Sequence, residues 1–334
     1  MIRARHVRMG ARYLAHRFQE VTPYEVQALL INACNLKCRY CRYPEIRTQL
    51  LSTEQWKSTL RELGELGTLR LKFQGGEPTL RHDFVELCAA SRRAGIVTAV
   101  VTNGIRVAKA PSLLAELDEL IVSLDSVTPA IHDGIRGEGS HAHAVAAIEA
   151  GRARGLPVYV IMALHRESAH ELEAMLDFCE SRGVGLHAQP LVLGREFYDE
   201  RSRAFQLDEE KNRAVHRQLV RLKRQGRSLM FSARAYERVA EWPDYDVLTT
   251  QSEGDSNCVA GRYYVHIEAN GDVWPCGLHG ADFKPQNVVE HGLVQALRHV
   301  RRHNCADCYM AYLNERKAAF SFRPHAVWEV VKRG

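Results

Sequence analysis

The stretch that decides the fold is Cys34-Asn35-Leu36-Lys37-Cys38-Arg39-Tyr40-Cys41, which follows an apolar, strand-like run over residues 26–33. Its C-x3-C-x2-C spacing can bring three thiolates to one inorganic centre. A structural zinc ion takes four protein ligands in a closed tetrahedron, whereas an iron–sulfur cube has four iron corners. Three protein ligands leave one iron open, so the stretch predicts a catalytic cluster. A zinc site completed by a remote histidine is the alternative.

Strand-like and helix-like runs alternate along the next part of the chain. The predicted strands are residues 26–33, 69–75, 96–102, 119–124, 157–163 and 184–190, and the helical patterns lie near 53–66, 82–94, 111–117, 141–155 and 169–182. Alternating strands and helices form parallel sheets with right-handed crossovers. Six such units predict an α/β fold, a partial (β/α)6 TIM-like barrel of parallel strands.

Polar and glycine-rich residues follow the predicted strands, at the ends where a parallel barrel gathers its chemistry. They are Gly75-Gly76-Glu77-Pro78, Thr102-Asn103-Gly104 and Ser123-Leu124-Asp125, then His187 and Gln189 on the sixth strand. This placement supports a site at the carboxyl ends of the strands, independently of the cysteines.

These motifs, in this order over roughly residues 25–190, resemble the radical S-adenosylmethionine (radical SAM) superfamily. The resemblance implies that the catalytic, metal-binding residues are Cys34, Cys38 and Cys41. In that family such cysteines hold a [4Fe-4S] cluster whose fourth iron binds the amine and carboxylate of S-adenosylmethionine (SAM).

The resemblance also implies the residues that bind SAM. Tyr40 matches the aromatic position near the adenine, and Gly75, Gly76 and Glu77 match the segment that contacts the methionine amino group. Further cofactor-binding residues are Ser123 and Asp125 toward the ribose, Arg136 toward a carboxylate, and Asn103. In place of SAM binding, the alternatives are that Gly75 and Gly76 only form a turn, that Asp125 only caps a helix, and that Arg136 is an exposed arginine.

A second cysteine group follows residues 241–257, which contain few apolar residues and predict a loop or linker. Its members are Cys258, Cys276, Cys305 and Cys308. A β-hairpin that turns at Asn270-Gly271 is predicted over residues 263–276, between the first two of these cysteines. Spacing alone leaves zinc and iron–sulfur open. The run Cys258-x12-Gly271-x4-Cys276 is similar to the start of the SPASM/twitch extension of radical SAM enzymes. That resemblance implies a second, auxiliary [4Fe-4S] cluster in a small C-terminal α+β twitch-like module.

The composition is that of a globular protein, with 334 residues, 46% of them hydrophobic and 25% charged. No apolar stretch is long enough for a membrane span, and a formal charge of +5 does not favour a nucleic-acid partner. Clustered cysteines favour metal binding in a cytoplasmic enzyme over disulfides. The predicted organisation is a basic N-terminal extension (1–24), a radical SAM core (25–197), a helical or loop connection (198–257) and an auxiliary cluster domain (258–334).

The resemblance implies a reaction. With an electron from a donor such as flavodoxin or ferredoxin, SAM is cleaved to a 5′-deoxyadenosyl radical that abstracts hydrogen from the substrate. Because only about 24 residues precede the first strand, we expect no winged-helix peptide-binding module before the barrel. We therefore predict an oxidoreductase or epimerase acting on a small polar metabolite, such as an aminoglycoside, sugar or nucleoside intermediate. The alternatives are a maturase of a ribosomally made peptide, by crosslinking or epimerisation, and a non-enzymatic zinc or iron–sulfur protein.

Two further pairs of residues are candidates for contact with the substrate. His187 and Gln189 share one face of the sixth strand, and we predict that they face the substrate; polar core positions are the alternative. Cys88 and Cys179 lie at apolar positions of helical patterns, which favours core packing, with hydrogen-atom donation as the alternative.

Overall fold

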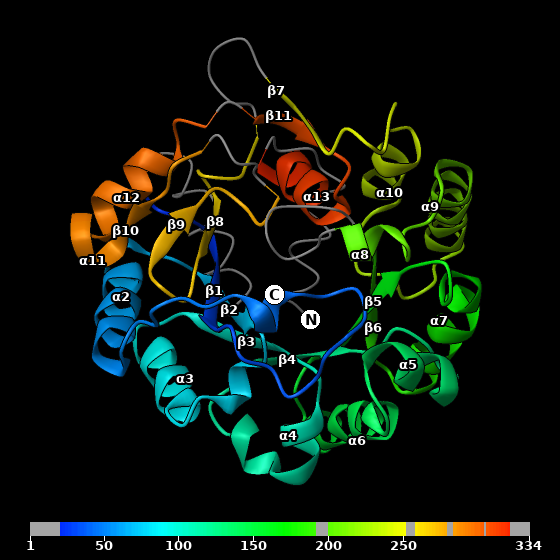
Figure 1. Cartoon of the computed structure of the whole chain (residues 1–334), viewed down its shortest axis with the longest axis horizontal. Coiled ribbons are helices and arrows are strands. Elements are labelled where there is room, and N and C mark those ends of the chain that lie inside the picture. The colour runs from blue at the N-terminus through cyan, green and yellow to red at the C-terminus, as the bar shows by residue number, and fades with distance from the viewer. Residues whose placement is uncertain (1–20, 192–199, 252–257, 279–282, 304, 321–334) are drawn as a thin grey trace.

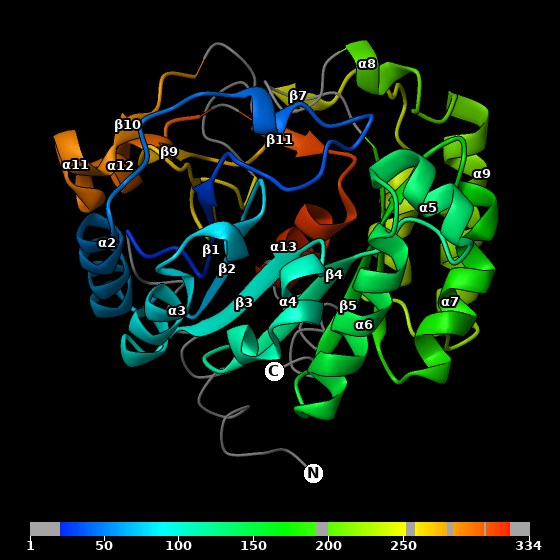
Figure 2. The same cartoon turned by 60° about the horizontal axis from the view of Figure 1, so that its bottom comes forward.

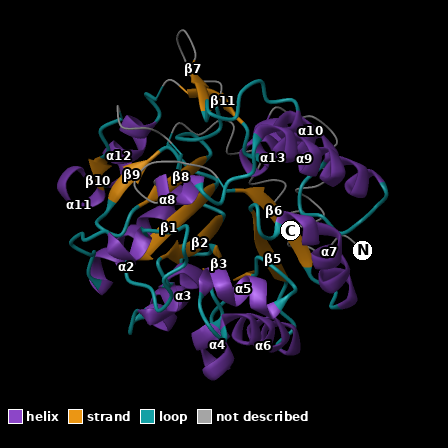
Figure 3. Ribbon diagram, turned by 45° about the vertical axis from the view of Figure 1, so that its right-hand side comes forward, coloured by secondary structure: helices purple, strands orange, loops and turns teal. Residues whose placement is uncertain are grey.

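A parallel sheet curves around the centre of the molecule, and helices surround it (Figures 1 and 3). The computed structural model describes residues 21–191, 200–251, 258–278, 283–303 and 305–320. Most of the predicted basic extension, residues 1–20, lies outside the described residues.

Six parallel strands form the wall of the barrel, and each pairs with the next along the chain. They are β1 (Glu25–Ile31), β2 (Arg70–Gly75), β3 (Val97–Thr102), β4 (Glu119–Ser123), β5 (Val158–Leu164) and β6 (Gly185–Pro190). The connecting helices are α2 (Thr53–Leu66), α3 (Phe84–Arg93), α4 (Ile105–Lys109), α5 (Pro129–Arg136), α6 (Ser140–Ala153) and α7 (Leu172–Ser181). The predicted partial barrel is confirmed. The short helices α4 and α5 were not predicted.

Local sequence explains where these elements begin and end. At α2, the Ser52 hydroxyl accepts from the backbone N–H of Gln55, and the Gln55 side chain accepts from that of Ser52, a capping box. The helix ends at Gly67, whose φ of 95° is left-handed. Between these ends, Trp56 and Leu60 are fully buried against the sheet.

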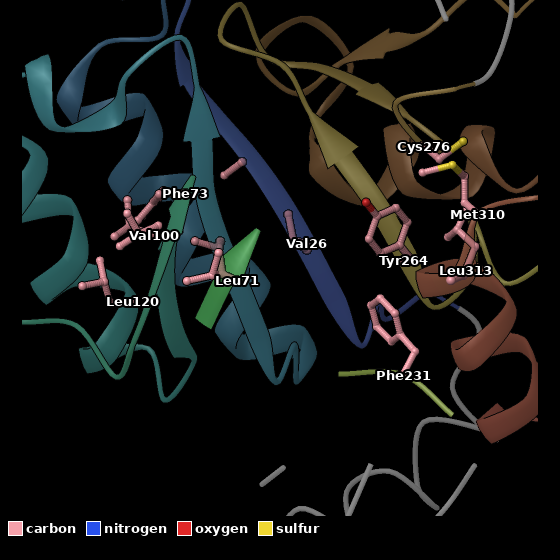
Figure 4. Close-up of a cluster of buried hydrophobic side chains, with 14 of the residues drawn as sticks. Val26, Leu71, Phe73, Val100, Leu120, Phe231, Tyr264, Cys276, Met310 and Leu313 are labelled. Atoms are coloured by element: carbon pink, nitrogen blue, oxygen red, sulfur yellow. The ribbon is translucent and has the colours of Figure 1, made fainter. Parts of the chain in front are cut away.

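Along each strand, side chains point alternately outward to an apolar face and inward to a more polar face. Val26, Leu71, Phe73, Val100 and Leu120 lie in the apolar core that the helices cover (Figure 4). The residues beside them in sequence point the other way, so that the barrel interior is lined by polar side chains, among them Glu25, Gln27, Arg70, Lys72, Gln74 and Glu119. The period-two geometry of a strand therefore creates a polar cavity inside an apolar shell.

The C-terminal part of the chain extends the barrel sheet. The hairpin of β8 (Tyr264–Ile267) and β9 (Asp272–Trp274) places β8 parallel to β1, and β10 (Gln286–Asn287) follows on the other side of β9. The sheet therefore has nine strands in the order β10-β9-β8-β1-β2-β3-β4-β5-β6. A separate auxiliary cluster domain over 258–334 stays a prediction.

The remaining elements close the open side of the barrel. They are α8 (Glu200–Arg203), α9 (Glu209–Arg224), α10 (Ala233–Ala240), β7 (Thr249–Gln251), α11 (Val288–His291), α12 (Leu293–Val300), β11 (Cys305–Cys308) and α13 (Ala311–Phe320). Helix α13 packs against α10, inside the ring of outer helices (Figures 1 and 2). Within the predicted linker 241–257, β7 pairs with β11, and residues 252–257 lie outside the described residues. Over the described residues, no helix has the length and apolarity to cross a membrane.

Candidate active site

The three cysteines of the first group lie in the loop that follows β1. Cys34, Cys38 and Cys41 all line one cavity of about 300 Å³ at the carboxyl ends of the strands. The loop is held locally, because the backbone N–H of Cys41 donates to the Cys38 carbonyl over 3.0 Å and that of Leu36 donates to Cys34 Sγ over 3.4 Å. The structure therefore brings the predicted triad together.

The thiols are suited to a cluster rather than to one metal ion. Burial raises the pKa of Cys34 and of Cys41 to about 11, so metal binding has to displace thiol protons. Across the residues that the structure describes, no three His, Cys, Asp or Glu side chains are arranged around a single metal ion. In a [4Fe-4S] cube each thiolate binds its own iron, so three thiols around one cavity fit that group.

Gly75 and Gly76 let the end of β2 lie directly against the cysteine loop. Gly75 has a φ of +136°, and the N–H of Gly76 donates to the Ile31 carbonyl over 2.7 Å. A Cβ on Gly76 would lie 2.2 Å from the carbonyl oxygens of both Asn32 and Ala33. The sequence predicts that the backbone of these glycines approaches SAM closely; the structure shows that it also approaches the backbone of residues 31–33. Both glycines line the cavity.

Glu77 is buried behind the cavity wall and does not line it. Its carboxylate accepts from the Thr79 and Thr102 hydroxyls at 2.6 and 2.9 Å, and from the Asn103 backbone N–H at 2.9 Å. Burial raises the pKa of Glu77. The carboxylate therefore joins the ends of β2 and β3, and its pairing with a methionine ammonium stays a prediction.

Asn103 connects this wall to the cysteine loop. Its side-chain Nδ2 donates to Asn35 Oδ1 over 2.8 Å and lies 3.8 Å from Cys34 Sγ. Asn103 lines the cavity with Ser123, so both are positioned to touch a ligand there.

Asp125 is the centre of a buried polar network at the end of β4. Arg136 donates to both of its oxygens, from Nε over 2.6 Å and from Nη2 over 3.0 Å. The Tyr40 hydroxyl donates to Oδ2 over 2.8 Å, and the Ala163 backbone N–H donates to Oδ1 over 3.1 Å. Burial opposes ionisation, but Arg136 outweighs it and lowers the pKa of Asp125 to about 2.

This network decides which of the predicted residues face the cavity. Asp125 is fully buried and does not line it, whereas Tyr40 and Arg136 do. Asp125 therefore acts by orienting Tyr40 and Arg136, and a direct contact with a ribose stays a prediction.

The two candidate substrate residues lie at different depths. Gln189 lines the cysteine cavity and also a second, inner cavity of about 170 Å³. His187 lines only the inner one, where its ring meets the Phe231 ring edge-on at 4.7 Å. Cys88 and Cys179 are fully buried in the apolar core away from both cavities.

In the second cysteine group, Cys276, Cys305 and Cys308 are buried and Cys258 is half-buried. The Cys305 thiol donates a hydrogen bond to Cys258, which lowers the pKa of Cys258 to about 7. Cys308 interacts electrostatically with Cys258 and Cys276. Backbone N–H groups point at two of the sulfurs, from Ala260 to Cys258 and from Leu278 to Cys276, over 3.5 and 3.4 Å. Four converging thiols could occupy all four corners of a cube.

Residues from the C-terminal part of the chain that were not candidates from sequence also line the first cavity. His266 on β8, Met310 and Tyr312 line it together with the cysteine triad. Met310 and Tyr312 lie two and four residues after Cys308. That proximity to a predicted ligand is a local signal, but only the packing of α13 shows which cavity they reach.

Comparisons with known proteins agree on one family. The profile of the Radical SAM superfamily matches residues 29–179. A PqqA peptide cyclase of Gluconobacter oxydans is 29% identical over 277 residues, which cover 79% of this chain and 72% of that protein. A PqqA peptide cyclase of Xanthomonas campestris pv. campestris is 32% identical over 276 residues, covering 78% of this chain and 68% of its own.

A solved structure shares the fold. The crystal structure of Streptococcus suis SuiB bound to S-adenosylmethionine has a TM-score of 0.65 at 18% identity, over 86% of this chain and 68% of that one. SuiB has also been solved bound to its precursor peptide SuiA, with a TM-score of 0.62 at 19% identity over 87% of this chain and 68% of that one.

These comparisons correct the predicted substrate. The small polar metabolite, and with it the small-molecule partner, is wrong, because the curated relatives matched over more than three quarters of the chain are peptide cyclases. Their name does not support an oxidoreductase or epimerase type either. The error has a physical origin: the barrel motifs are those expected to bind a cofactor that the whole superfamily shares, so they carry no information on the substrate. The prediction therefore relied on the number of residues before the first strand, and that number does not indicate the substrate.

Proposed function

This chain belongs to the radical SAM superfamily of SAM-dependent iron–sulfur enzymes, and on that premise we propose that it modifies a ribosomally made peptide. The reaction we propose is a crosslink between two residues of that peptide. The observation that carries this proposal is the match of 78–79% of the chain to peptide cyclases. In addition, the three cysteines that follow β1 line one cavity.

The residues of the first cavity would hold the cofactors. Cys34, Cys38 and Cys41 would ligate three irons of a [4Fe-4S] cluster. Bound there, the cluster and SAM supply a 5′-deoxyadenosyl radical that can abstract hydrogen from an unactivated carbon. Tyr40 and Arg136, oriented by Asp125, present an aromatic face and a guanidinium to the cavity, as an adenosyl group and a carboxylate require.

The protein's part in this chemistry is position and exclusion of water. The first cavity is lined by strand residues, by the cysteine loop and by residues from β8 and α13. A reacting carbon held beside the adenosyl group in such a site gains rate from proximity.

We also propose that the second cysteine group holds an auxiliary [4Fe-4S] cluster, in a twitch-like module. Its ligands would be Cys258, Cys276, Cys305 and Cys308, and the converging buried thiols support this. A crosslink removes two hydrogen atoms from the peptide: one would go to the 5′-deoxyadenosyl radical, and the other would leave as a proton and an electron. A cluster with no open iron would accept that electron.

The test is anaerobic co-expression with short open reading frames that neighbour the gene. We expect one peptide to lose two hydrogen atoms by mass, with a crosslink located by tandem mass spectrometry and one 5′-deoxyadenosine formed per crosslink. The Cys38→Ala variant should give neither product. Release of 5′-deoxyadenosine without any change in a peptide would contradict the peptide substrate while leaving the radical chemistry intact.

A further inference from the structure

The two cavities of the barrel meet at a waist, which five residues line from both sides. They are Gln74, Val101, Ile161, Gln189 and Tyr312. Above the waist lie the cysteines of the first group, and below it the barrel interior continues toward the first residues of the strands. A ligand that enters past the cysteines therefore meets the waist before it can go deeper.

Gln74 and Gln189 at the waist, with Gln27 just below it, supply the hydrogen-bonding groups of this part of the barrel. On neighbouring strands, Gln74 Nε2 donates to Gln27 Oε1 over 2.6 Å. This one bond leaves an amide oxygen and further N–H groups of the pair toward the cavity, whichever way the two amides are turned. The side chain of Gln189, on β6, makes no hydrogen bond within the described part of the chain, and it lines both cavities. The waist therefore offers both donors and acceptors.

Two ion pairs neutralise charged groups deeper in the barrel. Arg70 Nη2 lies 2.6 Å from Glu119, and Lys72 Nζ lies 2.7 Å from Glu25. A carboxylate entering the barrel would have to compete with these ion pairs. The open hydrogen-bonding capacity is that of neutral amides at the waist.

A neutral amide ligand matches this arrangement. A secondary amide carries one N–H donor and one carbonyl acceptor, which are the complements of the acceptor and donors that the glutamines keep. Buried polar groups are normally hydrogen-bonded, and Gln27 is only 9% exposed. Its partially used amide, with Gln74 and Gln189, indicates a ligand that completes the set.

We propose that Gln27, Gln74 and Gln189 bind an amide group of the peptide substrate and so place the residue to be modified above the waist, beside the SAM site. This inference rests on the proposed peptide substrate. The amide is either a main-chain peptide bond or the carboxamide of an Asn or Gln side chain. These glutamines are positioning residues, and they decide which part of the peptide reaches the radical.

The test measures binding of small amides to the reconstituted full chain with SAM present, by saturation-transfer NMR. The probes are the methylamide N-methylacetamide, its ester isostere methyl acetate, and acetamide. We expect the methylamide to bind at millimolar concentration, and Gln74→Leu or Gln189→Leu to weaken it roughly three- to tenfold, as loss of one or two hydrogen bonds does. The matched control is Gln218→Leu, at a surface glutamine that contacts Glu173; it should bind like the unaltered protein.

Each outcome decides the proposal. Stronger binding of the methylamide than of the ester supports a main-chain amide, and stronger binding of acetamide supports a side-chain carboxamide. The inference is overturned if no probe saturates the unaltered protein up to about 100 mM, or if the leucine variants bind as well as the control. Because the Gln189 side chain makes no hydrogen bond within the described chain, Gln189→Leu remains informative if Gln74→Leu does not fold. Iron content and SAM cleavage measured on the same samples show separately whether the proposed function holds.

Discussion

Arg316 on α13 is ion-paired with Glu25, the first residue of β1, 291 positions earlier in the chain. Arg316 Nε donates to Glu25 Oε2 over 3.2 Å, and the Glu25 side chain is 2% exposed. Burial opposes the ionisation of Glu25, yet Arg316 and Lys72 outweigh it and hold the pKa of Glu25 well below its ordinary value. The pair ties the helix after the second cysteine group to the barrel.

Removing the arginine should destabilise the protein strongly. Arg316→Met leaves the Glu25 carboxylate buried with one cation fewer, and breaking such a pair costs about 3 kcal/mol of unfolding free energy. The control is Arg92→Met, which breaks the exposed pair with Glu116 and should cost less than about 1 kcal/mol. Denaturant titration under anaerobic conditions compares the two, and equal effects would mean that α13 is not held by this pair.

Adding one methyl group at Gly76 should disturb the cysteine loop. A Cβ there would lie 2.2 Å from two backbone oxygens, so the chain has to move. We expect Gly76→Ala to lose most of the iron bound by the first cysteine group. Gly134→Ala is the control, because a Cβ on this helical glycine meets nothing within 4 Å. It should bind iron normally and be slightly more stable.

Neutralising Asp125 should weaken SAM binding without removing the cluster. Asp125→Asn breaks the ion pair with Arg136 and alters the hydrogen bond from Tyr40, and both partners line the cavity. We expect the dissociation constant for SAM to rise about tenfold, equivalent to about 1.4 kcal/mol, at unchanged iron content. Equilibrium binding of labelled SAM measures this. Glu149→Gln, at an exposed carboxylate, should change neither quantity.

The two cysteine groups should be separable by iron analysis. The reconstituted chain should hold about eight irons. Replacing Cys34, Cys38 and Cys41 with alanine should leave about four irons and abolish SAM cleavage. Replacing Cys305 and Cys308 should also leave about four irons, but with SAM cleavage retained. Zinc in either group, or loss of cleavage only when the second group is altered, would contradict the assignment.

His216 should make stability depend on pH. Burial lowers its pKa to about 4 from the ordinary 6.5. Below pH 6.5 His216 is therefore protonated in the unfolded chain but stays neutral in the folded chain. The unfolding free energy falls as the pH falls toward 4. We expect a loss of about 1.4 kcal/mol between about pH 7.5 and about pH 5.5.

The His216→Gln variant should lose that part of the pH dependence in urea titrations at the two pH values. His170→Gln, at an exposed position, should keep it. An unchanged slope in His216→Gln would show that other groups cause the acid sensitivity.

The elements and the first site were largely predictable because their signals are local. Strand and helix patterns follow from the period of apolar residues along a few turns, as at α2 with its cap at Ser52 and its end at Gly67. The three cysteines lie within eight residues, so their convergence needs no knowledge of the fold. The hairpin at Asn270-Gly271 is equally local.

Sequence alone thus determined the barrel, the cysteine loop and the strand ends that carry the polar residues. Only the tertiary structure decided that β8 pairs with β1, that Glu77 and Asp125 turn away from the cavity, and that Tyr312 and Gln189 meet at the waist. Periodicity shows which side of a strand a residue occupies. Which side chains from distant segments meet there depends on long-range packing, which no local pattern encodes.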